Sequence, residues 1–186
     1  RNKSLIMASF RQRIMKIVYP IIRRLGKLGK NGTVLYNKDN QKVLQSFYDL
    51  EITLINGKSL SLSTLSGKKT LLVNTASDCG YTRQYAELQE LSIKYKNTLT
   101  IIGFPSNDFK EQEKGEDQDI SKFCQLNYGV TFPLTEKSTV IKDVHQNTIF
   151  EWLTNINKNG WNDHAPDWNF SKYLVDEHGN LIAYFG

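Results

Sequence analysis

Two continuous apolar runs with a helical pattern between them constrain the fold of this chain most strongly. Residues 70–77 read "TLLVNTAS" and residues 99–106 read "LTIIGFPS", and each run is typical of a buried strand. Between the two runs, apolar residues recur at helical spacing from Tyr85 to Tyr95. A strand, a helix and a second strand in succession favour an α/β arrangement.

Hairpins are predicted on both sides of this unit. Residues 48–65 form two alternating runs around Asn56-Gly57, which is a strong signal for a two-residue turn. Residues 170–186 predict a second hairpin that turns near Gly179.

Two further helices are expected, over residues 117–128 and 146–156. The apolar face of the first would consist of Ile120, Phe123 and Leu126. The apolar face of the second is given by Ile149, Phe150 and Leu153. Strands and helices therefore alternate along the middle of the chain, without an internal repeat.

The net charge of +5 comes from the first 30 residues, which carry nine Lys and Arg and no acid. The remainder has 15 basic and 19 acidic residues, so we discount a nucleic-acid-binding function. Residues 1–45 are interpreted as a basic arm and linker, and residues 46–186 as the folded domain. No run approaches the roughly 20 apolar residues of a membrane span.

The composition of the arm is typical of an organelle transit peptide. A basic amphipathic helix on an anionic membrane would look similar, and a solvated helix with no targeting role is the third reading. We therefore expect a cytoplasmic or organellar protein, of mitochondrial or plastid type, with a peripheral membrane contact as one role of the arm. A secreted protein is not expected, because two cysteines are too few for a disulfide scaffold.

Those two cysteines are the candidate reactive groups. Cys79 lies between the first predicted strand and the following helix, where unpaired N–H groups favour a thiolate. The alternative is a small buried residue. Cys124 lies on or beside the apolar face of the 117–128 helix, which allows a buried core thiol. The local sequence Cys79-Gly80-Tyr81-Thr82 lacks a second cysteine, which disfavours a dithiol exchange enzyme, and no metal-ligand spacing is present.

Four segments together resemble the glutathione peroxidase family over residues 46–186. They read "VNTASDCGYTRQYAELQEL", "IIGFPSNDFKEQEKG", "FCQLNYGVTFPL" and "DWNFSKYLVDEHGNL". The resemblance implies a thioredoxin-like α/β fold, with a central mixed sheet flanked by helices and an N-terminal β-hairpin. It assigns Cys79 as the peroxidatic residue and Gln112, Trp168 and Asn169 as its partners. These three side chains are neutral groups that can donate hydrogen bonds without titrating.

The resemblance is to the cysteine-containing, thioredoxin-dependent branch of phospholipid-hydroperoxide type, in which Cys124 would be the resolving residue. Cys79 would form a sulfenic acid, Cys124 would condense with it to a disulfide, and thioredoxin would reduce that disulfide. We expect the helix around Cys124 to unwind for this step. A glutathione-dependent one-cysteine peroxidase and a peroxide-sensing redox relay are the alternatives.

The expected substrates are hydrogen peroxide and organic or lipid hydroperoxides, with thioredoxin or glutathione as the reducing co-substrate. No metal or organic cofactor is implied. The connection over residues 157–170 lacks the insertion of the tetrameric members, so a monomer is expected.

The chain departs from the family pattern in the loop around Gln112. Ser106 replaces a frequent third cysteine, and Asp108, Lys110 and Lys114 replace Gln, Gly and Pro, which changes the charge and flexibility of the loop beside Gln112. The family also continues into a last helix, which is missing after residue 186. Pro133 is expected at the cis-proline position of thioredoxin-like folds.

Overall fold

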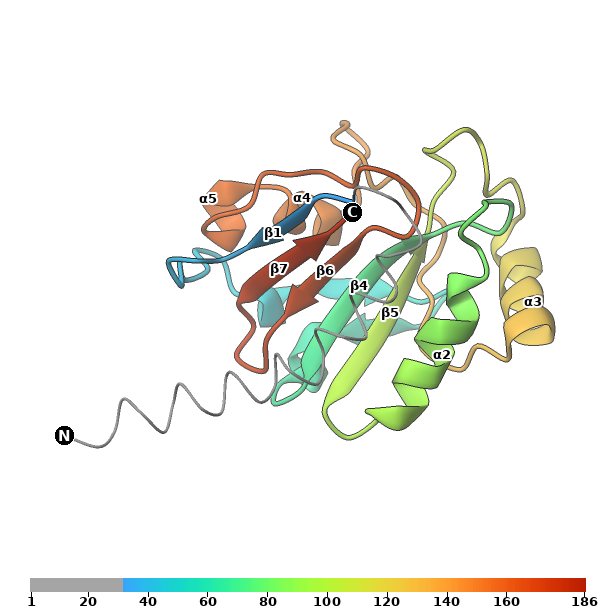
Figure 1. Ribbon diagram of the computed structural model, residues 1–186, viewed down its shortest axis with the longest axis horizontal. Coiled ribbons are helices and arrows are strands. Elements are labelled where there is room, and N and C mark those ends of the chain that lie inside the picture. The colour runs from blue at the N-terminus through green and yellow to red at the C-terminus, as the bar shows by residue number, and fades with distance from the viewer. Residues whose placement is uncertain (1–31) are drawn as a thin grey trace. The chain divides into compact units, whose positions relative to one another are not determined.

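The computed structural model describes residues 32–186, of which Thr33–Gly186 forms one compact unit (Figure 1). The targeting and membrane predictions for the basic arm concern residues 1–31 and lie outside the described residues. Within residues 32–186, no helix combines the length and apolar character that a membrane crossing needs.

A five-stranded mixed sheet forms the centre of this unit. In spatial order its strands are β1 (Val34–Tyr36), β7 (Leu181–Phe185), β6 (Lys172–Val175), β4 (Lys69–Thr75) and β5 (Leu99–Pro105). β4 and β5 are parallel, and the other neighbours are antiparallel. The expected α/β architecture with a central mixed sheet is therefore confirmed.

The two predicted hairpins are also confirmed. β2 (Glu51–Thr53) and β3 (Ser59–Ser61) form a separate two-stranded antiparallel sheet. Two short 3-10 helices flank this hairpin, η1 (Phe47–Asp49) and η2 (Leu62–Leu65). β6 and β7 form the second hairpin, with Gly179 in the turn at a φ of 83°.

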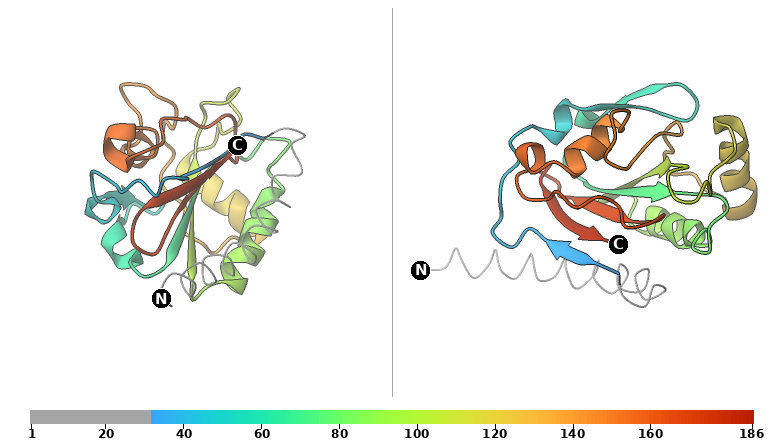
Figure 2. Two further views of the ribbon diagram at one scale, coloured as in Figure 1. Left: turned by 60° about the vertical axis from the view of Figure 1, so that its left-hand side comes forward. Right: turned by 90° about the horizontal axis from the view of Figure 1, so that it is seen from above.

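Helices cover both faces of the central sheet. α2 (Gln84–Lys94) lies on one face, and α4 (Thr148–Leu153) and α5 (Ile156–Asn159) lie on the other (Figure 2). α3 (Asp117–Tyr128) lies beside α2 and has the bounds that the sequence predicts. The sequence does not predict α5 as a separate helix, because it is only four residues long.

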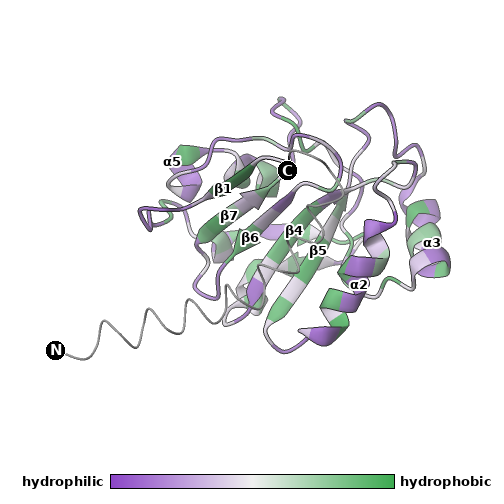
Figure 3. Ribbon diagram, viewed as in Figure 1, coloured by the Kyte–Doolittle hydropathy of each residue, from purple (hydrophilic) through white to green (hydrophobic). Residues whose placement is uncertain are grey.

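The core lies between the sheet and α4. β5 and the middle of β4 are hydrophobic, whereas α2 and α3 alternate hydrophobic with hydrophilic residues (Figure 3). Phe104 of β5 meets Phe150 of α4 edge to face, with ring centroids 5.1 Å apart. Such aromatic pairs add stability beyond the area that they bury. The predicted face of α4 is confirmed, since Ile149, Phe150 and Leu153 are fully buried.

The predicted apolar face of α3 is wrong at one position. Leu126 is 85% exposed, and the buried residues of this 12-residue helix are Ile120 and Cys124. Helical spacing places Cys124 one turn after Ile120, so these two side chains are buried on the same side of the helix.

Residues 33–45 are not a linker, and the domain begins before residue 46. Val34 in β1 pairs with Phe185 in β7, so this edge strand belongs to the central sheet. Leu44 and Gln45 both donate their backbone N–H to the carbonyl of Lys158 in α5, at 2.9 and 3.0 Å. The expected cis-proline is also wrong, since the bond before Pro133 is trans.

Gly160, which follows α5, lies in close contact with the backbone of residues 33–45. Its φ is +94°, and a Cβ built on it would lie 2.2 Å from the Lys42 carbonyl oxygen. Gly129 also has a positive φ, of +61°, but has no atom within 4 Å of a built Cβ.

We expect Gly160→Ala to lower the free energy of unfolding by about 3 kcal/mol and Gly129→Ala by about 1 kcal/mol. Urea unfolding of both variants measures the difference, and equal losses would contradict the packing of Lys42 on α5.

Candidate active site

Cys79 lies one turn before α2, in the segment that leaves β4. Successive turns lead from it into the helix, with Thr82 N–H donating to the Cys79 carbonyl at 3.0 Å. The backbone N–H of Tyr81 donates to Cys79 Sγ at 3.4 Å, and the side chain is partly exposed. The seam between strand and helix therefore offers the sulfur a backbone donor, as the sequence predicts.

Gln112 and Asn169 are brought into direct contact, although 57 residues separate them along the chain. Asn169 Nδ2 donates to Gln112 Oε1 at 2.9 Å, while Asn169 Oδ1 is buried and has no hydrogen-bond partner. With Oε1 engaged, the amide N–H groups of Gln112 are the donors available to a sulfur or peroxide oxygen. Gln112 is also linked to the Cys79 segment, because its carbonyl accepts the N–H of Asp78 at 3.0 Å.

Trp168 lies half-buried beside the same loop. Its ring centroid is 5.4 Å from that of Phe109 and 5.6 Å from Lys110 Nζ. Both partners come from the segment that carries Gln112. The contacts of Gln112, Trp168 and Asn169 therefore meet at one loop.

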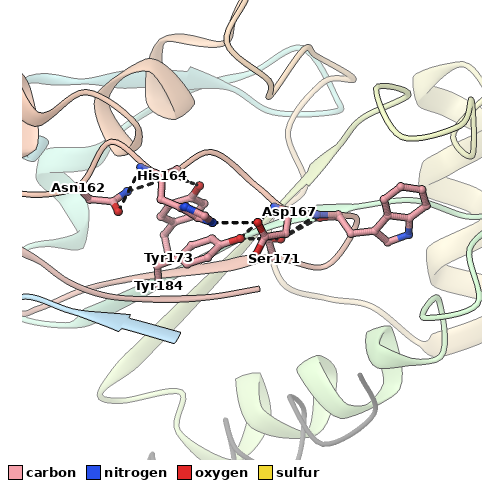
Figure 4. A network of polar contacts seen from close by, with 7 residues as sticks. Asn162, His164, Asp167, Ser171, Tyr173 and Tyr184 are labelled. Carbon is pink, nitrogen blue, oxygen red and sulfur yellow. Dashed lines mark hydrogen bonds and ion pairs between the residues drawn. The ribbon is translucent and has the colours of Figure 1, made fainter. Parts of the chain in front are cut away.

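The backbone of the Trp168 segment is held by a network of polar contacts (Figure 4). Asp167 N–H donates to the Tyr184 hydroxyl at 3.0 Å, and Ser171 Oγ donates to the Trp168 carbonyl at 2.9 Å. Burial raises the pKa of Tyr184 to about 12, so the hydroxyl stays protonated. His164 Nε2 lies 2.9 Å from Asp167 Oδ1 and closes the network.

Asn74 in β4 is a positioning residue that the sequence motifs do not reveal. It is fully buried, its Nδ2 donates to the Trp168 carbonyl at 2.9 Å, and its own carbonyl accepts the N–H of Phe170 at 2.7 Å. The signal that could have found it is an amide inside an otherwise apolar strand, where a buried polar group needs a partner.

The altered residues of the Gln112 loop have identifiable places. Lys110 and Glu111 adopt φ angles of 52° and 53°, in the left-handed region that glycine tolerates best, which explains why glycine suits position 110. Asp108 Oδ2 accepts the N–H groups of Val140 and Ile141 at 2.6 and 3.2 Å. This carboxylate ties the loop to residues 140–141, so the loop has a defined anchor in place of the family's usual residues.

Cys124 is not brought to Cys79. Both thiols are free, and Cys124 is 1% exposed in α3, where it faces the hydroxyl of Tyr85. Burial raises the pKa of Cys124 to about 11, whereas the interaction with Tyr85 lowers it. In this conformation Cys124 is a protonated core thiol, which is the alternative that its place on the apolar face of the helix allows.

Metal chemistry has no evident place in the described part of the chain. Among residues 32–186, no three His, Cys, Asp or Glu side chains are grouped so that they could hold a metal ion. His164 instead pairs with Asp167 beside the Trp168 segment.

Comparison with known proteins identifies one family of relatives over most of the described residues. Residues 47–154 match the family model described as glutathione peroxidase. The chain is 43% identical over 141 residues to glutathione peroxidase-like peroxiredoxin 2 of Saccharomyces cerevisiae, covering 75% of this chain and 86% of that protein. It is 43% identical over 140 residues to the glutathione peroxidase homolog BsaA of Bacillus subtilis, covering 74% and 86%. The crystal structure of T. cruzi GPX1 superposes with a TM-score of 0.56 at 27% identity, covering 76% of this chain and 86% of that one. This neighbour supports the expected thioredoxin-like fold.

The two cysteines should differ sharply in reactivity. At pH 8 we expect iodoacetamide to modify Cys79. Cys124 should react about 100-fold more slowly than an ordinary exposed thiol. The reason is that a pKa of about 11 leaves almost no thiolate and the side chain is buried. Mass spectrometry of timed samples measures both rates. Cys124 should become reactive in urea, and rapid native modification of Cys124 in the Cys79→Ser variant would contradict its burial.

Proposed function

The chain belongs to the glutathione peroxidase family and is a thiol peroxidase, and we propose that it works through two cysteines, Cys79 and Cys124. Its substrates are hydrogen peroxide and organic or lipid hydroperoxides, and thioredoxin is its reductant. The observation that carries the proposal is the joining of Gln112 to both Asn169 and the Cys79 segment.

Cys79 performs the first step. Its thiolate attacks one peroxide oxygen, the O–O bond breaks, and the electron pair leaves with the other oxygen, which takes a proton to form water or an alcohol. Cys79 is oxidised to a sulfenic acid. The amide of Gln112, the Asn169 amide and the Trp168 indole N–H are neutral donors suited to the charge on the departing oxygen.

Cys124 performs the second step. Its sulfur attacks the Cys79 sulfenic acid, water leaves, and a disulfide forms. Thioredoxin then reduces this disulfide by two thiol exchanges. Since a disulfide needs Cα atoms within about 7 Å, Cys124 must leave its buried position. α3 is suited to this opening because Ile120 and Cys124 are its only buried side chains.

A glutathione-dependent one-cysteine peroxidase is the second candidate, and the burial of Cys124 favours it. A thiol that is 1% exposed reacts slowly, so an external thiol could reach the sulfenic acid first. In both cases sulfur carries the chemistry, and the proposal includes no metal or organic cofactor. It also describes a monomer, because the segment over residues 157–170 lacks the insertion of the tetrameric members.

Steady-state turnover with the two reductants distinguishes these candidates. We expect consumption of hydrogen peroxide and cumene hydroperoxide with thioredoxin and thioredoxin reductase, and loss of this turnover by at least about tenfold in Cys124→Ser, because the internal disulfide cannot form. Equal or better turnover with glutathione and glutathione reductase, unaffected by Cys124→Ser, would establish the one-cysteine enzyme. A single stoichiometric oxidation of Cys79 without turnover would point to a redox relay.

Opening of α3 has its own test. Peroxide-oxidised protein should show faster amide hydrogen exchange over Asp117–Tyr128 than reduced protein, because forming the disulfide requires the helix to unwind. The matched control is oxidised Cys124→Ser, in which α3 should keep its protection. Oxidised protein in which Cys79 is blocked while Cys124 can still be alkylated after unfolding in urea would contradict the two-cysteine mechanism.

A further inference from the structure

Glu113 is a buried acid that the proposed mechanism does not use. It follows Gln112 directly and is 1% exposed. An ionised carboxylate is costly to bury unless hydrogen bonds compensate for lost water. Its partners are therefore informative about its role.

Those partners join Glu113 to the Cys79 segment. Ser77 Oγ donates to Glu113 Oε2 at 3.1 Å, and the neighbouring Asp78 N–H donates to the Gln112 carbonyl at 3.0 Å. Two consecutive residues of one segment thus bind two consecutive residues of the other. The backbone N–H of Glu113 is held as well, by Asn107 Oδ1 at 2.9 Å. We call this pair of contacts, Ser77–Glu113 and Asp78–Gln112, the clasp.

We propose that Glu113 is a positioning residue for peroxide reduction, whose carboxylate holds Ser77 and thereby fixes Gln112 relative to Cys79. This inference rests on the proposed function of Cys79. The hydroxyl-to-carboxylate bond is the half of the clasp that depends on ionisation, because a hydrogen bond to a charged acceptor is stronger than one to a neutral acceptor.

The groups around Glu113 come from four parts of the chain. Ser77 approaches from the end of β4, Tyr85 from α2, Cys124 from α3 and Lys137 from a later loop. Lys137 Nζ donates to the Gly115 carbonyl at 2.7 Å and lies 3.8 Å from Glu116, so it is shared with other acceptors. Ser77 is therefore the one side chain with a direct hydrogen bond to the Glu113 carboxylate among the described residues.

Burial raises the pKa of Glu113 to about 7, while Ser77 and Lys137 lower it. Because this pKa lies above the ordinary value, ionisation of Glu113 at high pH lowers the free energy of unfolding. The hydrogen bond from Ser77 to the carboxylate is nevertheless strongest in the ionised state, because a charged acceptor binds a donor more strongly. Peroxide reduction should therefore weaken as pH falls through about 7, in addition to any change in the Cys79 thiolate.

The rates of two reactions of Cys79 distinguish an effect on the position of Gln112 from an effect on the fraction of thiolate. In a Cys124→Ser background, stopped-flow tryptophan fluorescence gives the rate constant of Cys79 with hydrogen peroxide between pH 5 and 9. Iodoacetamide alkylation over the same range follows the Cys79 thiolate and does not need Gln112. We expect Glu113→Gln to lower the peroxide rate about tenfold at pH 8 and to remove the change near pH 7, with the alkylation profile unchanged.

The clasp supplies its own controls. Ser77→Ala should cause a similar loss, and combining it with Glu113→Gln should add little, because both substitutions weaken or remove the same contact between residues 77 and 113. Glu111→Gln should leave the rate unchanged, since Glu111 is an exposed acid of the same loop that pairs with Lys114. Ser77→Ala also keeps the test decisive if Glu113→Gln does not fold.

Three results would overturn the inference while the unsubstituted protein still reacts with peroxide. These are an unchanged peroxide rate in Glu113→Gln and Ser77→Ala, fully additive losses in the double variant, or a parallel shift of the alkylation profile. Absence of any reaction between unsubstituted Cys79 and peroxide would instead overturn the proposed function, and the inference with it.

Discussion

The parallel pairing of β4 with β5 is the constraint on which the site depends. Thr75 lies opposite Pro105 at the end of both strands, and Ser106 N–H extends the pairing by donating to the Thr75 carbonyl at 3.0 Å. Because parallel strands end at the same edge of a sheet, the segment toward Cys79 and the segment toward Gln112 start side by side. The clasp between them is a consequence of this register.

A third segment joins this edge through buried polar side chains rather than apolar packing. Asn74 and Tyr184 hold the backbone around Trp168 and Asn169 by hydrogen bonds at 2.7 to 3.0 Å. Buried polar groups of this kind fix one geometry, because any other would leave them without partners. Lys110 and Glu111 add local strain at the same place, a cost that tightly held functional loops often carry.

α3 contrasts with this rigid edge. It has helix-compatible spacing and acids in its first turn, yet it is anchored through two buried side chains. One of these is Cys124, so the residue proposed to leave the helix is also part of what holds it in place. Oxidation of Cys79 would thus open a helix with two buried side chains, while the core between the sheet and α4 stays intact.

The sequence by itself determined the long elements and the chemistry of the site. β4, β5 and α2 have apolar patterns that satisfy their own periodicity, and the motifs around Cys79, Gln112, Trp168 and Asn169 carry the family resemblance. Tertiary structure alone decided the rest. β1 is three residues long and exists through pairing with β7. Leu126 is exposed because α3 contacts the rest of the domain on one side only. Glu113 is buried through contacts with Ser77 and Asn107. These features depend on partners that are distant in sequence, which local periodicity does not encode.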